Sequence, residues 1–245
     1  MRSLSAADIV RIWELGQDRH PIDRALLLLA YAFPEKKLTE LASWSIGCRD
    51  ASLLMLREIT FGEQLNSFAT CPQCQENLEF SLNTKDLRII DPDTITPLSN
   101  YQVSIDRLNL HFRLPNSLDL ATVMTAVDEE TATLQLAKQC LLEAHLEGKV
   151  VSSEELPETA IAILTQQLTE TDPQAEILLD LSCPACGHVW QVLFDIVDFF
   201  WRELSNQAQR LLQEVHSLAK VYGWQEAEIL NMSAIRRQYY LDLAN

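Results

Sequence analysis

Two short steps of the form Cys-Pro-x-Cys constrain the fold of this chain more than any other feature. They are Cys71-Pro72-Gln73-Cys74 and Cys183-Pro184-Ala185-Cys186. Together they supply four sulfur atoms, which is the number of ligands that a tetrahedral structural zinc site takes. We therefore predict one structural Zn²⁺ per chain, with the ligands Cys71, Cys74, Cys183 and Cys186.

Apolar residues alternate with polar ones on both sides of each step, which predicts two β-hairpins. The alternating stretches are 68–70 and 78–82 around the first step, and 177–181 and 189–194 around the second. Each pair of cysteines would then lie at a hairpin tip, as in a zinc knuckle. Gly187 follows the second step and suits a left-handed turn, whereas the first step has Gln75 at that place.

The distance between the two steps along the chain is unusual. More than one hundred residues separate Cys74 from Cys183, whereas a compact zinc ribbon has about 15–20 residues between its cysteine pairs. A folded insertion of this length would cost little stability. Each doubling of the loop length costs only about 0.6 kcal/mol, whereas a structural zinc site contributes about 10–16 kcal/mol. The sequence thus predicts a split zinc ribbon, with an insertion whose ends meet at the metal.

Other readings of the cysteines stay open at this point. The two pairs could be unrelated and buried, or each could form a redox-active disulfide. Thioredoxin-like enzymes carry a single such motif where a helix begins after a strand, and neither step here opens a helix. His188 could replace one cysteine as a ligand, but its position favours the start of the returning strand.

The predicted fold class is α+β and mostly helical, with helical regions at both ends. Pro21 suits the first turn of a helix, and the longest apolar stripe runs over 199–221. Inside the insertion, 101–105 and 109–114 alternate as a hairpin. Helices are expected to follow it over 118–127, 131–146 and 153–168. The expected regions are an N-terminal helical region 1–62, a first knuckle hairpin 63–90, an inserted α+β subdomain 91–173, a second knuckle hairpin 174–197 and C-terminal helices 198–245.

Composition narrows the classes of function. The 245 residues are 47% hydrophobic, enough for a sizeable core, and carry a formal net charge of −16. This charge disfavours binding to nucleic acid. The longest apolar run, 25–33, is too short to span a membrane, and the N-terminus lacks the pattern of a signal peptide, so we expect a soluble, cytoplasmic protein. Six cysteines fit a reducing compartment, and Cys48 and Cys140 are expected to be core residues.

Motifs of enzyme active sites are missing from the sequence. It contains no Gly-x-Ser-x-Gly, no glycine-rich phosphate loop and no His-Glu-x-x-His. A catalytic zinc also needs an open coordination position, which four thiolates would close. Acidic runs such as 128–130 lie at expected helix starts, where carboxylates favour the helix dipole. We therefore expect a protein that is not an enzyme.

Several stretches carry a resemblance to a known family. They are 13–29, 47–62, the two cysteine steps, and the tail segment 218–240. In these stretches the chain resembles baseplate proteins of contractile injection systems, which are phage-tail-like particles, and is similar to the hub-associated baseplate family of T-even phages. The inserted region is not matched by this resemblance.

The resemblance implies a structural or assembly role in a baseplate. Partners would be other baseplate, hub or sheath-proximal subunits, and only the four cysteines carry over as metal ligands. The aromatic and arginine-rich tail from Gln225 onward is the expected contact surface. Two matters stay open: whether the protein remains in the particle or leaves as a chaperone, and the alternative of a stand-alone cytoplasmic zinc-binding or thiol-redox regulatory protein.

Overall fold

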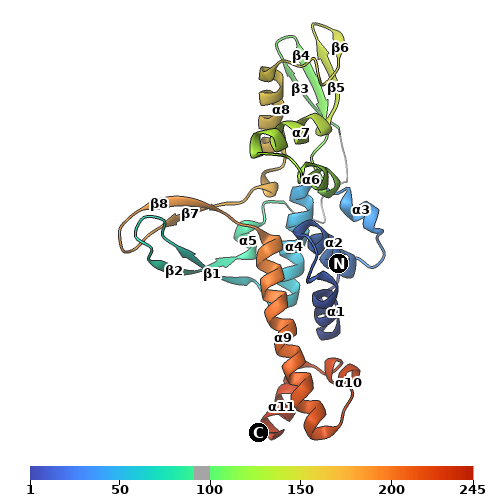
Figure 1. Ribbon diagram of the computed structural model, residues 1–245, viewed down its shortest axis with the longest axis vertical. Helices are drawn as coiled ribbons and strands as arrows, with labels where there is room; N and C mark the ends of the chain where they lie inside the picture. The colour runs from blue at the N-terminus through green and yellow to red at the C-terminus, as the bar shows by residue number, and fades with distance from the viewer. Residues whose placement is uncertain (91–99, 245) are drawn as a thin grey trace.

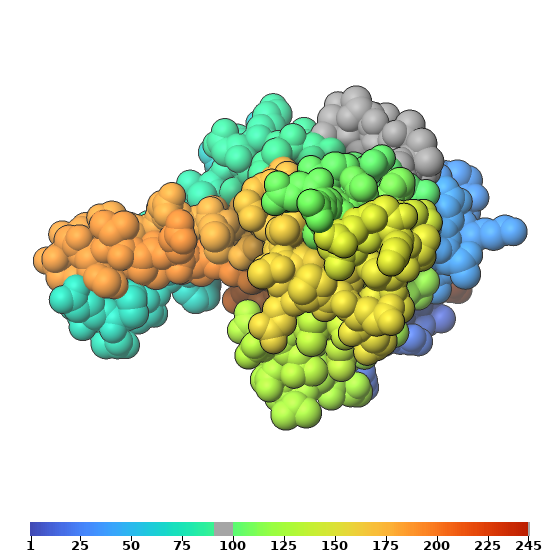
Figure 2. Space-filling model, turned by 90° about the horizontal axis from the view of Figure 1, so that it is seen from above, coloured from blue at the N-terminus to red at the C-terminus, as the bar shows by residue number. Residues whose placement is uncertain are grey.

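The computed structural model describes residues 1–90 and 100–244. Its long axis runs from the inserted region at one end, through a helical body, to the C-terminal helices at the other end (Figure 1). Two β-hairpins extend side by side from the body as a lateral arm (Figures 1 and 2). The molecule is thus a body with three projections rather than a sphere.

The helical body is formed by the N-terminal helices packed against one long later helix. Ser5 begins the first helix with a capping box, in which its Oγ accepts the Asp8 N–H at 3.1 Å and its own N–H donates to Asp8 at 2.9 Å. Pro21 occupies the first turn of the second helix, as predicted. The bounds are α1 (Ala6–Gly16), α2 (Pro21–Ala32), α3 (Leu38–Ala42), α4 (Ile46–Phe61) and α9 (Ile196–Tyr222).

The main hydrophobic core lies where α1, α2 and α4 meet α9. The face of α9 that enters the core carries Phe200, Leu204, Ala208 and Leu211, all at most 1% exposed. Their spacing of three and four residues is that of one helical face. Gly223, at φ 70°, ends α9 in the left-handed conformation. The apolar stripe predicted over 199–221 is confirmed as far as Leu218, whereas Val221 at its end is 53% exposed.

The arm consists of two antiparallel hairpins that belong to separate two-stranded sheets. They are β1 (Gln64–Thr70) with β2 (Asn77–Asn83), and β7 (Leu178–Ser182) with β8 (Val189–Leu193). In both hairpins, half-buried residues alternate with exposed ones along each strand, apart from the fully buried Leu65 near the base. Both hairpins predicted around the cysteine steps are therefore present.

The inserted region has its own sheet and core. Its strands, in the order in which they pair, are β3 (Tyr101–Ile105), β4 (Leu108–Phe112), β5 (Leu141–Leu146) and β6 (Lys149–Val151). Its longer helices are α6 (Ser117–Val123), α7 (Glu129–Cys140) and α8 (Glu158–Thr171). A second hydrophobic cluster, which includes Leu110, Phe112 and Leu164, joins the sheet to α7 and α8.

The helices predicted in this region are partly wrong: α6 ends at Val123 rather than 127, α8 begins at Glu158 rather than 153, and the last six residues of 131–146 are not helical. The pattern over 131–146 favoured a single helix, but α7 ends at Cys140 and the chain continues as strand β5. Glu147 and Gly148 have φ angles of 53° and 78°, so they form a turn that starts β6. The free edge of β4 pairs with β5, and this tertiary pairing overrides the helical spacing of the apolar residues.

The ends of the insertion do not meet at the cysteines, which corrects a second prediction. They meet beside α4, where the buried side chain of Gln174 joins the outgoing and returning chain. Its Oε1 accepts the N–H of Ile89 at 2.6 Å, and its Nε2 donates to the carbonyl of Leu87 at 3.1 Å. The seven-residue strands of β1–β2 carry the first pair of cysteines about 23 Å outward from this point.

The remaining elements are short or terminal. They are α5 (Thr84–Leu87), the 3₁₀ helix η2 (Pro173–Ala175), α10 (Glu226–Leu230) and α11 (Ala234–Ala244). Both α10 and α11 lie within 198–245, the region expected to consist of C-terminal helices. Within the described ranges, no helix combines the length and the apolar character needed to cross a membrane.

A close contact next to Gln174 leads to the first testable prediction. The Gly47 N–H at the start of α4 donates to Asp172 Oδ2 at 2.9 Å, and a Cβ on Gly47 would lie 1.8 Å from Asp172 Oδ1. We expect Gly47→Ala to destabilise the fold by about 1–3 kcal/mol, a fall in Tm of roughly 2–10 °C. Because the clash needs both side chains, adding Gly47→Ala to an Asp172→Ala variant should cost much less. Equal costs in both backgrounds, measured by thermal unfolding, would rule out this contact as the cause.

Candidate metal centre

The tips of the two hairpins bring all four predicted ligand residues together. The sulfur atoms of Cys71, Cys74, Cys183 and Cys186 all lie within 4.8 Å of one another. Residues that are far apart in the sequence meet because the two hairpins run side by side from the body (Figure 1).

The closest sulfur contacts join one hairpin to the other. The Cys71 and Cys186 Sγ atoms are 3.7 Å apart, and the Cys74 and Cys183 Sγ atoms are 3.6 Å apart. A disulfide would require about 2.05 Å, so these cysteines are free thiols. Four sulfurs at about 2.3 Å from a tetrahedral Zn²⁺ are about 3.8 Å apart. The spacing of this cluster therefore fits a four-thiolate metal site.

Both tips use the same backbone turn. The Cys71 N–H donates to the Glu76 carbonyl at 2.8 Å, and the Cys183 N–H donates to the His188 carbonyl at 2.8 Å. In each tip the residue after the second cysteine is left-handed, with φ of 63° at Gln75 and 73° at Gly187. The left-handed turn predicted for Gly187 is therefore present, and the first tip adopts it without a glycine.

The thiols of the cluster influence one another's protonation. Burial raises the pKa of Cys71, but N–H donors from Cys74 and Gln73 outweigh this effect and bring the pKa to about 7. The Glu76 N–H lowers the pKa of Cys74, but the neighbouring thiols of Cys186, Cys183 and Cys71 raise it to about 12. The pKa of Cys71 is thus well below that of Cys74 on the same hairpin tip. A divalent cation would favour all four thiolates.

The other candidate residues lie outside the cluster. The His188 ring stacks on Trp190, with centroids 5.8 Å apart and an angle of 11° between the planes, and His188 directly precedes β8. Cys48 and Cys140 are buried, and burial raises the pKa of each thiol to about 12. This burial confirms that Cys48 and Cys140 are core residues.

Comparison with known protein families gives a match over most of the chain. A model of the T4 bacteriophage base plate protein family matches residues 27–201 of this chain. The chain belongs to this base plate family. No curated protein and no solved structure matches it. The matched segment runs from within α2 to the first turns of α9, and so includes both hairpins and the inserted region. The base plate match therefore extends through the insertion, which the resemblance of separate stretches had left out.

The two tips offer a matched pair of substitutions. A non-glycine residue in the left-handed region costs about 1–2 kcal/mol, so Gly187→Ala should weaken the β7–β8 tip, and Gln75→Gly should relieve the β1–β2 tip. We expect amide protection of the altered hairpin to fall in the first variant and to rise in the second, by about five- to thirtyfold each. Hydrogen exchange with mass spectrometry measures both, and the unaltered hairpin is the internal control. If protection rose in both variants or fell in both, the left-handed backbone at residues 75 and 187 would not be the source of strain.

Proposed function

We propose that this protein is a structural or assembly component of the baseplate of a contractile, phage-tail-like particle. The base plate family match over residues 27–201 carries this proposal. The proposed role is not enzymatic: the four thiol groups at the hairpin tips can fill the coordination sphere of a zinc ion and leave no position for a substrate. Neighbouring baseplate, hub or sheath-proximal subunits are the proposed partners.

Within this role, the four cysteines are proposed to hold one structural Zn²⁺ per chain. The two hairpins share no strand pairing, and an isolated two-stranded hairpin is only marginally stable in water. A bound zinc ion contributes about 10–16 kcal/mol in small zinc domains, so one ion at the tips would fix two weak hairpins as a single arm. Cys71 and Cys183 are buried, while Cys74 and Cys186 remain exposed.

Removing one ligand tests the zinc proposal. In Cys74→Ser we expect zinc content to fall from about one ion per chain to below about one tenth, because a neutral hydroxyl replaces a thiolate ligand. Amides of 64–83 and 178–193 should exchange faster, while the helical body keeps its protection. Metal analysis and hydrogen exchange give the two readouts, and Cys140→Ala, which changes a thiol outside the cluster, is the matched control.

The same samples distinguish the zinc proposal from the alternative function, which is that of a thiol-redox regulator. A metal-free wild-type protein in which the cluster cysteines form a disulfide with a reduction potential in the cytosolic range would favour a thiol-redox regulator. That result would contradict the proposed structural zinc site but not the membership of the base plate family.

Contacts to neighbouring subunits are proposed for one face of α11. Ile235, Tyr239 and Leu243 follow one another at four-residue steps and are 85%, 63% and 62% exposed. The opposite side of the helix is anchored, because buried Arg237 pairs with Glu214 of α9 at 2.9 Å. Tyr240 also packs edge-on against Trp224, with ring centroids 4.8 Å apart. A fixed helix that presents an apolar stripe to solvent is a suitable contact surface.

Point substitutions on this stripe test the contact better than truncation, which would uncover α9. We expect Ile235→Lys with Tyr239→Lys to leave the Tm unchanged within about 2 °C, since both side chains are exposed. Incorporation into purified particles should fall by at least about tenfold, as expected for the loss of two central apolar contacts. Gln238→Lys, on a neighbouring exposed position, is the charge control. Normal incorporation of the double variant would show that α11 is not the contact surface.

A further inference from the structure

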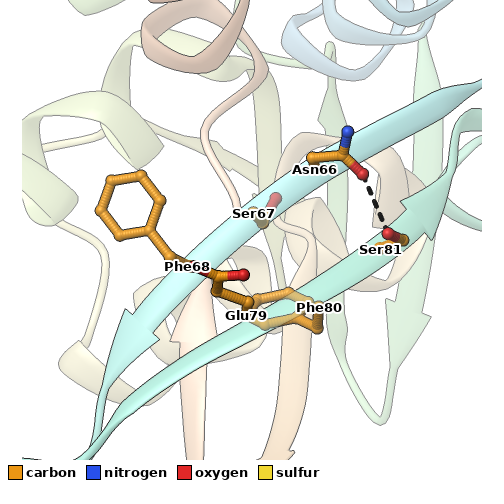
Figure 3. A pocket seen from close by; sticks show the side chains of 6 residues that line it. All are labelled: Asn66, Ser67, Phe68, Glu79, Phe80 and Ser81. Carbon is orange, nitrogen blue, oxygen red and sulfur yellow. Dashed lines mark hydrogen bonds between the residues drawn. The ribbon is translucent and has the colours of Figure 1, made fainter.

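The outer face of hairpin β1–β2 carries an exposed aromatic side chain beside a carboxylate. Phe68 is 76% exposed, and Glu79 lies directly opposite it on the neighbouring strand. Residues in such cross-strand positions have neighbouring side chains. Their surroundings on this face are small and polar, and Ser81 Oγ donates to Asn66 Oδ1 at 2.9 Å (Figure 3).

The two side chains border a hollow in the surface of the hairpin. The hollow has a volume of about 570 Å³ and is lined by Asn66, Ser67, Phe68, Glu79, Phe80 and Ser81. Figure 3 shows that the Phe68 ring projects away from the strands rather than folding back onto them. A large apolar ring held out into water is a common feature of protein contact surfaces.

The arm supplies no positive charge of its own to this hollow. Residues 64–83 and 176–195 contain no Lys or Arg, but they include Glu76, Glu79, Glu176, Asp180 and Asp195. Within the described ranges, Glu79 takes part in no ion pair. The arm is therefore an acidic surface with an exposed aromatic group, and its electrostatic complement is basic.

We propose that this hollow binds an arginine side chain from an extended segment of a neighbouring baseplate subunit. A guanidinium group is planar, so it can stack on the Phe68 ring while it donates hydrogen bonds to the Glu79 carboxylate. A lysine ammonium group would make the ion pair but would stack less well. The polar side chains of Asn66 and Ser81 also line the hollow.

This inference extends the proposed function, because the arginine would belong to a baseplate partner. It involves neither the α11 face nor the metal ligands, so its test can fail while the baseplate role stands. In turn, a failed incorporation test on α11 would leave the arginine site untouched. The two proposals are therefore separable.

The test uses the full-length, zinc-supplemented protein labelled with ¹⁵N and three synthetic peptides. The peptides alternate valine with arginine, with lysine or with citrulline, which has the shape of arginine but no charge. We expect the arginine peptide to shift the amide signals of residues 66–68 and 79–81 and to bind more tightly than the other two. A citrulline peptide of equal affinity would overturn the proposal, as would shifts spread over the helical body.

Two substitutions in the hollow and one outside it localise the effect. Glu79→Gln should weaken the arginine peptide about fivefold, as for a partly screened ion pair, and Phe68→Leu about two- to fivefold through loss of the stacked ring. Glu35→Gln changes another exposed carboxylate and should change affinity less than about 1.5-fold. Equal weakening by Glu35→Gln and Glu79→Gln would show only attraction to an acidic protein, and would overturn the site.

A second copy of this chain is the other source of an arginine. Sedimentation of the wild type and Glu79→Gln over a range of concentrations decides between the two sources. A monomeric wild type agrees with the assignment to a different subunit. Self-association that Glu79→Gln abolishes would overturn that assignment and make the hollow a contact between copies.

Discussion

Neither hairpin of the arm has a hydrophobic core of its own, and this constraint governs the outer half of the molecule. Each is a separate two-stranded sheet, and only one side of each is half-buried along its length. The main core covers the bases of the hairpins through Leu65 and Leu179 but not their tips. The tips meet through sulfur atoms 3.6 and 3.7 Å apart, which is where the proposed zinc ion would join the two hairpins.

The inserted region depends on a different set of interactions. The buried side-chain amide of Gln174 makes hydrogen bonds to backbone groups of the segment that leaves the first hairpin. Asp172 accepts the N–H of Gly47 at the start of α4, where a carboxylate is favoured by the helix dipole. These contacts fix both ends of the insertion to the body. Buried hydrogen bonds therefore hold the insertion in place between the two cysteine pairs, and the proposed metal site would act on the arm alone.

The sequence allowed accurate prediction wherever local chemistry decides the structure. The alternating stretches and the left-handed turn at Gly187 follow from side-chain period and backbone sterics, and the helix start at Pro21 follows from the fixed φ of proline. It failed where tertiary pairing decides. Residues 141–146 have a spacing that suits a helix or a strand, and only the free edge of β4 selects the strand. The role of Gln174 could not be predicted either, because a single glutamine residue forms no sequence pattern.

The same distinction explains why the four cysteines could be grouped but their place in the molecule could not. Ligand spacing predicts which side chains share a metal, whereas the length of the strands between ligand and body decides where that site lies. Here seven-residue strands in the first hairpin carry the site away from the core. A site at the end of an arm contributes little to the packing of the body. A zinc ion bound there, as proposed, would hold a fixed outward surface, which in a protein of the base plate family suits the proposed contact with a neighbouring subunit.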